Sequence, residues 1–236
     1  NTPYRNAQAV AELTIGFMLS LVRQITLLDN YIKNGDWQDP VGAYIYYKGS
    51  ELNGKTLGLI GLGRVGRIVS KLGNALGMNV IAHDPNVGHV GQRKYGCLLV
   101  PFHRVVTESN FLSLHSPSSI ENIPLIGDSE FSAMKQKSFL INTAAHDLID
   151  EDALARHIIS GHIAGAALDV HSAHPIPPSN PLLHLENVIL TPHIGGATRE
   201  TIDRYSSVML NEIRRYLDGI KPQHLVNEEA WNDHEC

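Results

Sequence analysis

The sequence predicts an α/β protein built on a doubly wound parallel sheet, and two observations predict it. Short apolar segments alternate along the chain with helical stretches, a pattern typical of parallel strands that are covered on both faces. A glycine-rich turn with the spacing GxGxxG, at residues 61–66, directly follows the first apolar segment and opens a helix. Together they indicate the Rossmann form of this architecture.

Composition fits one large domain or two small ones and excludes several classes of protein. Of the 236 residues, 43% are hydrophobic and 18% are charged, which rules out wholesale disorder. The 19 basic and 24 acidic residues give a net charge of −5 without a basic cluster, so we expect no nucleic acid or membrane partner. No apolar run approaches the roughly 18 residues of a membrane-spanning helix. The two cysteines, Cys97 and Cys236, form no disulfide framework and favour a reducing, cytoplasmic location, with Cys97 buried among apolar neighbours.

Residues 7–32 predict one long helix that is apolar on two faces. Such a helix has to be buried on both sides, so we expect one face to cover the protein's own core and the other to meet a second copy in a homodimer. The next residues, 34–49, are rich in Gly, Asp and Tyr, contain Pro40 and predict an extended loop. The apolar residues at helical spacing are Val10, Leu13, Phe17, Leu21, Ile25 and Leu28 on one face and Ala11, Ile15, Met18 and Val22 on the other.

Strands and helices alternate through the rest of the chain. One helix is expected from about residue 64 to 76, ending at Gly77, another starts at Asp150, and the last spans roughly 198–217. We expect a dinucleotide-binding domain with its dimerisation helix and loop over residues 1–220, then a C-terminal return segment and loose tail over 221–236. The expected strands are residues 56–60, 79–82, 111–114, 139–142, 164–168 and 188–190.

The glycine turn predicts an NAD site. Gly61 permits a tight turn, Gly63 lets a pyrophosphate approach the backbone, and Gly66 lets helix and strand pack closely. The helix that begins here offers free N–H groups and the positive end of its dipole to phosphates. Asp84, 18 residues after Gly66 and near the end of the next strand, is placed to bind ribose hydroxyls. A carboxylate there repels a 2′-phosphate, which favours NAD over NADP.

Residues 54–66 resemble the cofactor loop of the D-isomer-specific 2-hydroxyacid dehydrogenases, which include glyoxylate/hydroxypyruvate reductases, phosphoglycerate dehydrogenase and D-lactate dehydrogenase. Four further blocks agree in the same order, as do the helix at 6–21 and the ending 225–227, so the resemblance extends over nearly the whole chain. The four blocks are Leu112-Ser113-Leu114-His115-Ser116-Pro117, Leu140-Ile141-Asn142-Thr143-Ala144, Gly165-Ala166-Ala167-Leu168-Asp169-Val170 and Thr191-Pro192-His193-Ile194-Gly195-Gly196.

This resemblance implies an oxidoreductase that transfers a hydride between NAD(H) and a small 2-oxo or 2-hydroxy acid. His193 matches the family's catalytic histidine, which exchanges a proton with the substrate oxygen. The region of Tyr44–Tyr47 would reach across the dimer. The implied cofactor contacts are Arg64 and Val65 to the pyrophosphate, Asp84 to the adenosine ribose, Pro117 to the adenine side, Thr143 and Ala144 to the nicotinamide side through their backbone, and Asp169 to the carboxamide.

The sequence departs from the family's pattern at two positions. Ala145 stands where the family carries an arginine that grips the substrate carboxylate, and alanine supplies neither its charge nor its orientation. His174 stands where a glutamate keeps the catalytic histidine protonated, and a histidine beside His193 disfavours that proton. Loss of one positioned charge can cost about 100-fold in rate, so we expect turnover to be lower by orders of magnitude.

Three interpretations remain open. The residues were substituted deliberately to inactivate the protein. Alternatively, the chain is a natural NAD-binding scaffold or sensor without dehydrogenase activity, like the transcriptional corepressors that share this fold. In the third, Arg104, His146 or His171 serves an altered substrate.

Two further expectations concern what the chain lacks. His171 and His174 have no Cys or Glu at metal-ligand spacing, so we expect no metal site. The family's second α/β lobe, of the order of 100 residues upstream, forms the substrate cleft. The sequence opens at Asn1-Thr2-Pro3 without Met, at the helix that enters the cofactor domain, so we expect a truncated protein without most of that lobe.

Overall fold

A single parallel sheet organises the computed structural model, which describes residues 5–118, 123–227 and 229–232. Within these residues the sheet has eight strands in the order β3-β4-β2-β1-β5-β6-β7-β8, and every neighbouring pair is parallel except β3 and β4. The order runs outward from β1 in both directions, so the predicted doubly wound fold is confirmed. The strands are β1 Thr56–Ile60, β2 Asn79–His83, β3 Arg93–Lys94, β4 Cys97–Leu99, β5 Phe111–Leu114, β6 Ser138–Asn142, β7 Ile163–Leu168 and β8 Val188–Leu190.

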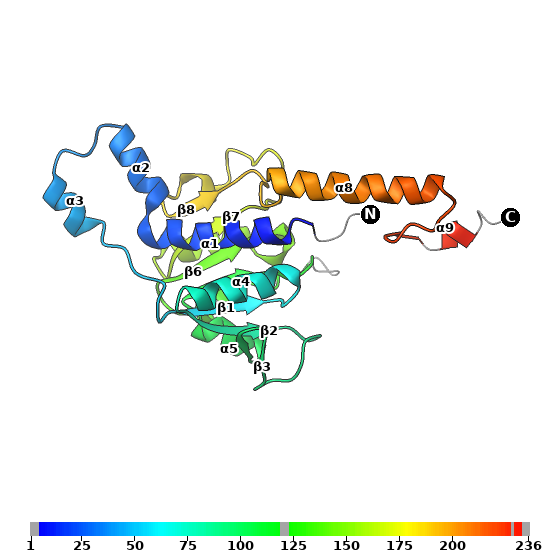
Figure 1. Ribbon diagram of the computed structural model, residues 1–236. Helices are drawn as coiled ribbons and strands as arrows, with labels where there is room; N and C mark the ends of the chain where they lie inside the picture. The colour runs from blue at the N-terminus through cyan, green and yellow to red at the C-terminus, as the bar shows by residue number, and fades with distance from the viewer. Residues whose placement is uncertain (1–4, 119–122, 228, 233–236) are drawn as a thin grey trace.

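Helices cover both faces of this sheet (Figure 1). Alternate residues of a strand point to opposite faces, so Phe111 packs with the layer of α1 and α4, while Leu112 packs with the layer of α5, α6 and α7. The helices are α1 Ala7–Arg23, α2 Ile25–Lys33, α3 Pro40–Tyr46, α4 Arg64–Ala75, α5 Phe102–Glu108, α6 Asp128–Ala133, α7 Glu151–Ile159, α8 Arg199–Leu217 and α9 Glu229–Asn232, with short 3₁₀ turns η1 His146–Leu148 and η2 Pro181–His184.

The single helix predicted over residues 7–32 is wrong, because the chain forms two helices. Gln24 adopts a left-handed conformation with φ of 53°, and its N–H bonds to the carbonyls of Ser20 and Leu21 at the end of α1. The axes of α1 and α2 then differ by 61°. Among the described residues no single helix is long and apolar enough to cross a membrane; only this bent pair together reaches that length and composition.

Both apolar faces of α1 are covered by the protein's own chain. Phe17 and Leu21 on one face and Met18 and Val22 on the other are all buried. Contrary to the prediction, α1 therefore needs no second copy of the chain to cover its second face. Exposed apolar side chains gather instead on α2, on α3 and in the segment between them, which project together from one end of the molecule (Figure 1).

The extended loop predicted over residues 34–49 is also partly wrong, because it contains α3. Asp39 caps this helix, its carboxylate accepting a hydrogen bond of 3.0 Å from the N–H of Val41. Pro40 occupies the first helical position, where its fixed φ suits a helix and its missing N–H costs nothing. The Asp-Pro pair therefore starts a helix rather than continuing a loop.

The other predicted elements are confirmed to within one residue at most ends. Gly77 follows α4 with φ of 75°, Asp150 caps α7, and Thr198 caps α8. Cys97 is buried, as predicted, and lies in β4, which with β3 was not predicted. Cys236 and most of the tail after Asn227 lie outside the described residues.

Candidate functional site

The predicted site residues all follow the carboxyl ends of parallel strands, where open α/β sheets bind their ligands. Backbone hydrogen bonds hold these strand ends together. The N–H of Gly61 donates to the carbonyl of His83 at 2.9 Å. The N–H of Asp169 donates to the carbonyl of Asn142 at 3.0 Å. The sheet order reverses between β1 and β5, beside the glycine turn. From β2 to β8, the residues that follow the strands are Asp84, Gly61–Gly66, Pro117, Thr143 with Ala144, Asp169 and His193.

The three glycines of the turn have three different surroundings. A Cβ on Gly61 would lie 2.6 Å from the carbonyl oxygen of His115, and one on Gly66 would lie 2.2 Å from the carbonyl oxygen of Gly61. Both positions are therefore closed by the protein itself. A Cβ on Gly63 would meet no atom of the described residues within 4 Å. Since Gly63 directly precedes α4, the first turn of this helix is open to a ligand just where a pyrophosphate is expected.

Asp84 is held beside this turn. Its Oδ2 accepts a hydrogen bond of 2.7 Å from the N–H of Leu62, and its Oδ1 accepts one of 2.8 Å from the N–H of Asn86. A carboxylate can accept about four hydrogen bonds, so both oxygens keep capacity for ribose hydroxyls. The acid is thus oriented before any ligand arrives.

His115 is a residue for which the sequence reasoning predicted no role. Its carbonyl oxygen occupies the space that a Cβ on Gly61 would need, and its Nε2 lies 2.9 Å from the hydroxyl of the buried Ser113. Desolvation lowers the pKa of its imidazole to about 4, so the ring is neutral at physiological pH. A neutral ring places no charge beside the glycine turn. Pro117 follows two residues later and is exposed.

The turn after β6 is shaped by side chains that the sequence reasoning also missed. Asn142 donates through Nδ2 to the carbonyl of Ala145 at 2.8 Å and accepts at Oδ1 from the N–H of Ala144 at 3.0 Å. The hydroxyls of Thr143 and Thr14 lie 3.1 Å apart in the interior. The role of Thr14 could have been detected in the sequence, because Thr14 is a polar residue on the buried side of an apolar helix.

Asp169 anchors the loop that carries His193. This carboxylate is 1% exposed. Its Oδ1 accepts from the hydroxyl of Thr191 at 2.6 Å and from the N–H of Ile194 at 2.8 Å, while Oδ2 accepts from the N–H of Gly195 at 2.7 Å. The three donors lie on both sides of His193 in the sequence. His193 itself has a left-handed backbone with φ of 55°, so its exposed side chain projects from a fixed turn.

Three imidazoles form a row at this end of the sheet. The ring centroids of His193 and His174 are 6.3 Å apart, as are those of His174 and His171. The predicted proximity of His174 to His193 is therefore confirmed. His171 is buried, and its Nε2 carries a proton that it donates to the carbonyl of Thr191 at 2.8 Å, since a carbonyl can only accept. Within the described part of the chain, no three His, Cys, Asp or Glu side chains are placed to hold a metal ion.

Arg104, one of the three residues expected to serve an altered substrate, is paired within its own helix. It lies on α5, which packs on β1 and β2, and its Nη2 bonds to the carboxylate of Glu108 at 3.0 Å. Three strands separate β1 from β8, after which His193 follows. Arg104 therefore lies on a different part of the sheet from the strand end that His193 follows. Of the other two residues expected to serve an altered substrate, His146 is exposed in η1 directly after Ala145, and His171 is buried.

Comparison with known proteins decides the family. A model of the D-isomer specific 2-hydroxyacid dehydrogenase NAD binding domain matches residues 15–195. The chain belongs to this family. Its members are NAD(P)-binding dehydrogenases of 2-hydroxyacids.

Two curated relatives and one solved structure show how far the likeness extends. D-3-phosphoglycerate dehydrogenase of Archaeoglobus fulgidus is 39% identical over 227 residues, which are 96% of this chain and 42% of that protein. Glyoxylate reductase of Korarchaeum cryptofilum is 33% identical over 230 residues, 98% of this chain and 69% of the reductase. D-lactate dehydrogenase with NAD+ from Lactobacillus jensenii superposes with a TM-score of 0.84 at 27% identity, over 97% of this chain and 71% of that one. The chain thus spans between about two fifths and seven tenths of the length of these relatives.

Proposed function

We propose that this chain binds NAD(H) at the glycine turn and is the cofactor-binding part of an oxidoreductase that moves a hydride between NAD(H) and a small 2-oxo or 2-hydroxy acid. The observation that carries the proposal is the open backbone at Gly63, at the start of α4 and beside the fixed carboxylate of Asp84. A dinucleotide needs both features, one for its pyrophosphate and one for its ribose.

Each predicted site residue keeps its proposed role. The first turn of α4, with Arg64 and Val65, binds the pyrophosphate, Asp84 binds the adenosine ribose, and Pro117 lines the adenine side. The backbone of Thr143 and Ala144 approaches the nicotinamide. Asp169 also holds the carboxamide, since among the described residues Oδ2 accepts one hydrogen bond, from the N–H of Gly195, and a carboxylate oxygen can accept a second.

His193 has the role of exchanging a proton with the substrate oxygen while the bound cofactor accepts or supplies the hydride. An imidazole suits this task because it titrates near neutral pH. The clamp formed by Asp169 keeps the loop in one geometry, which limits the reorganisation needed when substrate binds.

Calorimetric titration with NADH tests the cofactor proposal. We expect binding at or below millimolar concentration, and weaker binding of NADPH because its 2′-phosphate meets the carboxylate of Asp84. Absence of heat with both NAD and NADH at millimolar concentration would overturn the proposal. Equal affinity for NADH and NADPH would overturn only the predicted preference for NAD over NADP.

A second candidate function, a non-catalytic NAD-binding scaffold or sensor, is favoured by Ala145 and His174. Where an acid would pair with a protonated His193, the chain has an imidazole whose ring centroid is 6.3 Å away, and two charged imidazoles at that distance repel. A deliberately inactivated form would behave in the same way. Oxidation of NADH by glyoxylate or hydroxypyruvate would count against both, whereas NAD-dependent dimerisation without turnover would support the scaffold.

We also propose the assembly and organisation of the chain. The exposed apolar side chains of α2 and α3 favour a homodimer formed through this projection. Residues 1–220 form the cofactor domain with its dimerisation segment, and residues 221–236 form the return segment, where His224 bonds back to Glu212 of α8. A buried, unpaired Cys97 fits the cytoplasm as the proposed location.

A further inference from the structure

A hollow of about 460 Å³ lies between the N-terminal parts of α1, α4 and α8. Four arginines line it: Arg5 just before α1, Arg64 and Arg67 on α4, and Arg204 on α8. The other described residues that line it come from α1 and α4, and none of these is acidic. Four positive charges therefore meet in one place, on a chain whose net charge is −5.

Two of these guanidinium groups are fixed by contacts within the chain. Arg204 donates through Nε to the carbonyl of Arg5 at 2.8 Å and through Nη2 to the hydroxyl of Thr201 at 3.1 Å. Arg67 donates through Nε to the carbonyl of Leu62 at 2.8 Å, and its guanidinium lies 4.0 Å from the ring centroid of Tyr95. A guanidinium has five N–H donors, so these contacts orient both groups and leave most of their donors for another acceptor.

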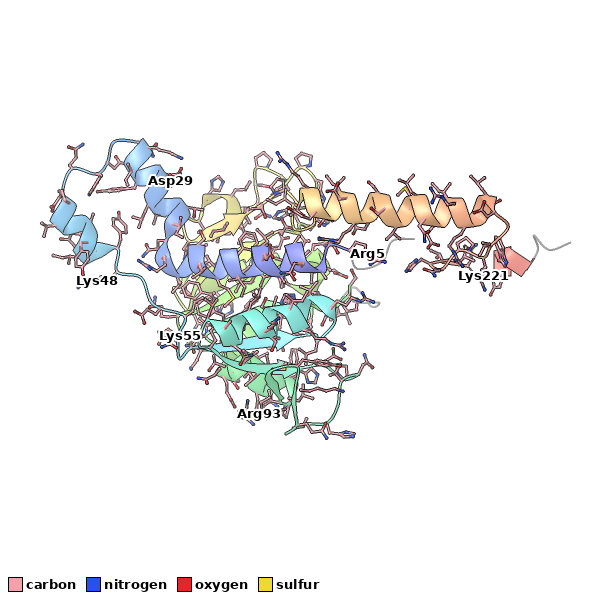
Figure 2. All side chains as sticks on the ribbon, in the orientation of Figure 1. Arg5, Asp29, Lys48, Lys55, Arg93 and Lys221 are labelled. Atoms are coloured by element: carbon pink, nitrogen blue, oxygen red, sulfur yellow. The ribbon has the colours of Figure 1, made fainter. Side chains whose placement is uncertain are left out.

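Arg5 supplies an independent sign of a missing acceptor. Its Nε is buried and has no hydrogen-bond partner within the described residues. Such an unpaired donor costs about 1–3 kcal/mol, more when the group is charged, so native structures rarely keep one without a reason. Figure 2 shows Arg5 at the start of α1, close to α8, whose Arg204 bonds to the Arg5 carbonyl. The orphan donor therefore belongs to the arginine hollow.

We infer that the arginine hollow is a second anion site, which binds a phosphate group outside the proposed cofactor site. Guanidinium forks match phosphate oxygens in pairs, and a phosphate of nearly two negative charges uses four cations better than a single carboxylate does. Arg64 is the first residue of α4, so the two sites are neighbours. The ligand class is a phosphorylated small molecule, with inorganic phosphate as its simplest member.

Calorimetric titration with inorganic phosphate at constant ionic strength tests this site. The Arg5→Gln/Arg204→Gln variant should bind phosphate at least tenfold more weakly than the unaltered chain. The matched control, Arg104→Gln/Arg156→Gln, removes two arginines whose partners are the exposed Glu108 and Asp128, and its phosphate affinity should stay within twofold. Circular dichroism establishes that each variant folds.

Saturation with NADH separates this site from the cofactor's phosphates. Phosphate binding should persist in the presence of NADH, and the Arg5/Arg204 variant should keep its NADH affinity within about threefold. The inference is overturned by no phosphate binding at 10 mM, by equal phosphate affinity in the two double variants, or by full competition from NADH. Tighter binding of malonate than of phosphate would overturn the ligand class.

Discussion

At the scale of single residues, Asp169 shows how one buried side chain can fix the loop that carries another site residue, His193. This one buried carboxylate accepts hydrogen bonds from three groups that lie on both sides of His193 in the sequence. A carboxylate suits the position because it only accepts, while an amide of the same shape brings two donors. The sequence pattern points to the residue, but its hydrogen bonds depend on a loop that comes from 22 to 26 residues further along.

We predict that Asp169→Asn lowers the free energy of unfolding by about 1–3 kcal/mol and loosens the His193 loop. The new NH₂ group would face the N–H of Ile194 or Gly195, leaving a buried donor unpaired. Urea unfolding measures the first effect, and line broadening of the His193 Cε1–H signal in NMR measures the second. The control Asp203→Asn, at an exposed position of α8, should change stability by no more than about 0.5 kcal/mol. Equal effects of the two variants would contradict the clamp.

His115 predicts a pH dependence of stability. Its pKa is about 4 in the folded chain and near 6.5 when unfolded, so above pH 6.5 the ring is neutral in both states. As pH falls from 6.5 to 4, the unfolded state binds a proton that the folded state does not bind. The free energy of unfolding therefore falls by up to about 3 kcal/mol. His115→Gln should remove this part of the decline in urea midpoints between pH 7 and pH 4. The exposed His103→Gln should leave the decline unchanged, and parallel curves for His115→Gln and the unaltered chain would contradict the prediction.

At the scale of elements, the glycines in the turn between β1 and α4 serve different purposes, some for folding and one for ligand binding. Gly66→Ala should cost about 3 kcal/mol or more of unfolding free energy, because its Cβ would lie 2.2 Å from a backbone oxygen. Gly63→Ala should cost less than about 1 kcal/mol, because its Cβ enters open space. That same Cβ would stand where the pyrophosphate approaches, so NADH affinity should fall at least tenfold. Urea unfolding and NADH titration of both variants separate the effects, and intact NADH binding by Gly63→Ala would contradict the proposed site.

The elements that the sequence predicted well are those whose signals are local. Strands such as Phe111–Leu114 are continuous apolar runs, and α8 carries its own cap at Thr198. The break at Gln24 could not be predicted, because glutamine favours helix and takes the left-handed conformation only in the folded context. Helix α3 could have been predicted from its Asp-Pro start. Strand β3 has two residues and exists only through its pairing with β4, so no periodicity can mark it.

For the candidate site, the sequence located the residues better than their interactions. A position in a motif says which strand end a residue follows, and the sheet brings those ends to one edge. It does not say that the Asn142 side chain bonds to the nearby carbonyl of Ala145, nor that Arg204 meets Arg5, a contact between residues 199 positions apart. Such contacts depend on how helices and loops pack, which no local pattern contains.

At the scale of the whole molecule, two projections leave the sheet and its helices. Helix α8 extends from one end and the α2–α3 segment from the other (Figure 1). Both present exposed apolar side chains, which a folded chain rarely keeps in a cluster without a partner surface. The α2–α3 segment carries the larger aromatic share, with Tyr44 and Tyr46 each 82% exposed.

We therefore predict that the chain sediments as a dimer at tens of micromolar and that Tyr44→Asp/Tyr46→Asp shifts it toward monomer by at least tenfold in dissociation constant. Each tyrosine can bury 150–250 Å², and a buried carboxylate in its place would lack a partner. The control Val90→Asp/Ile159→Asp adds two charges at apolar positions that are 62% and 67% exposed elsewhere, and it should leave the dimer intact. A monomer for the unaltered chain would refute the dimer. Equal dissociation of the two double variants would show that added charge, not the α2–α3 surface, governs assembly.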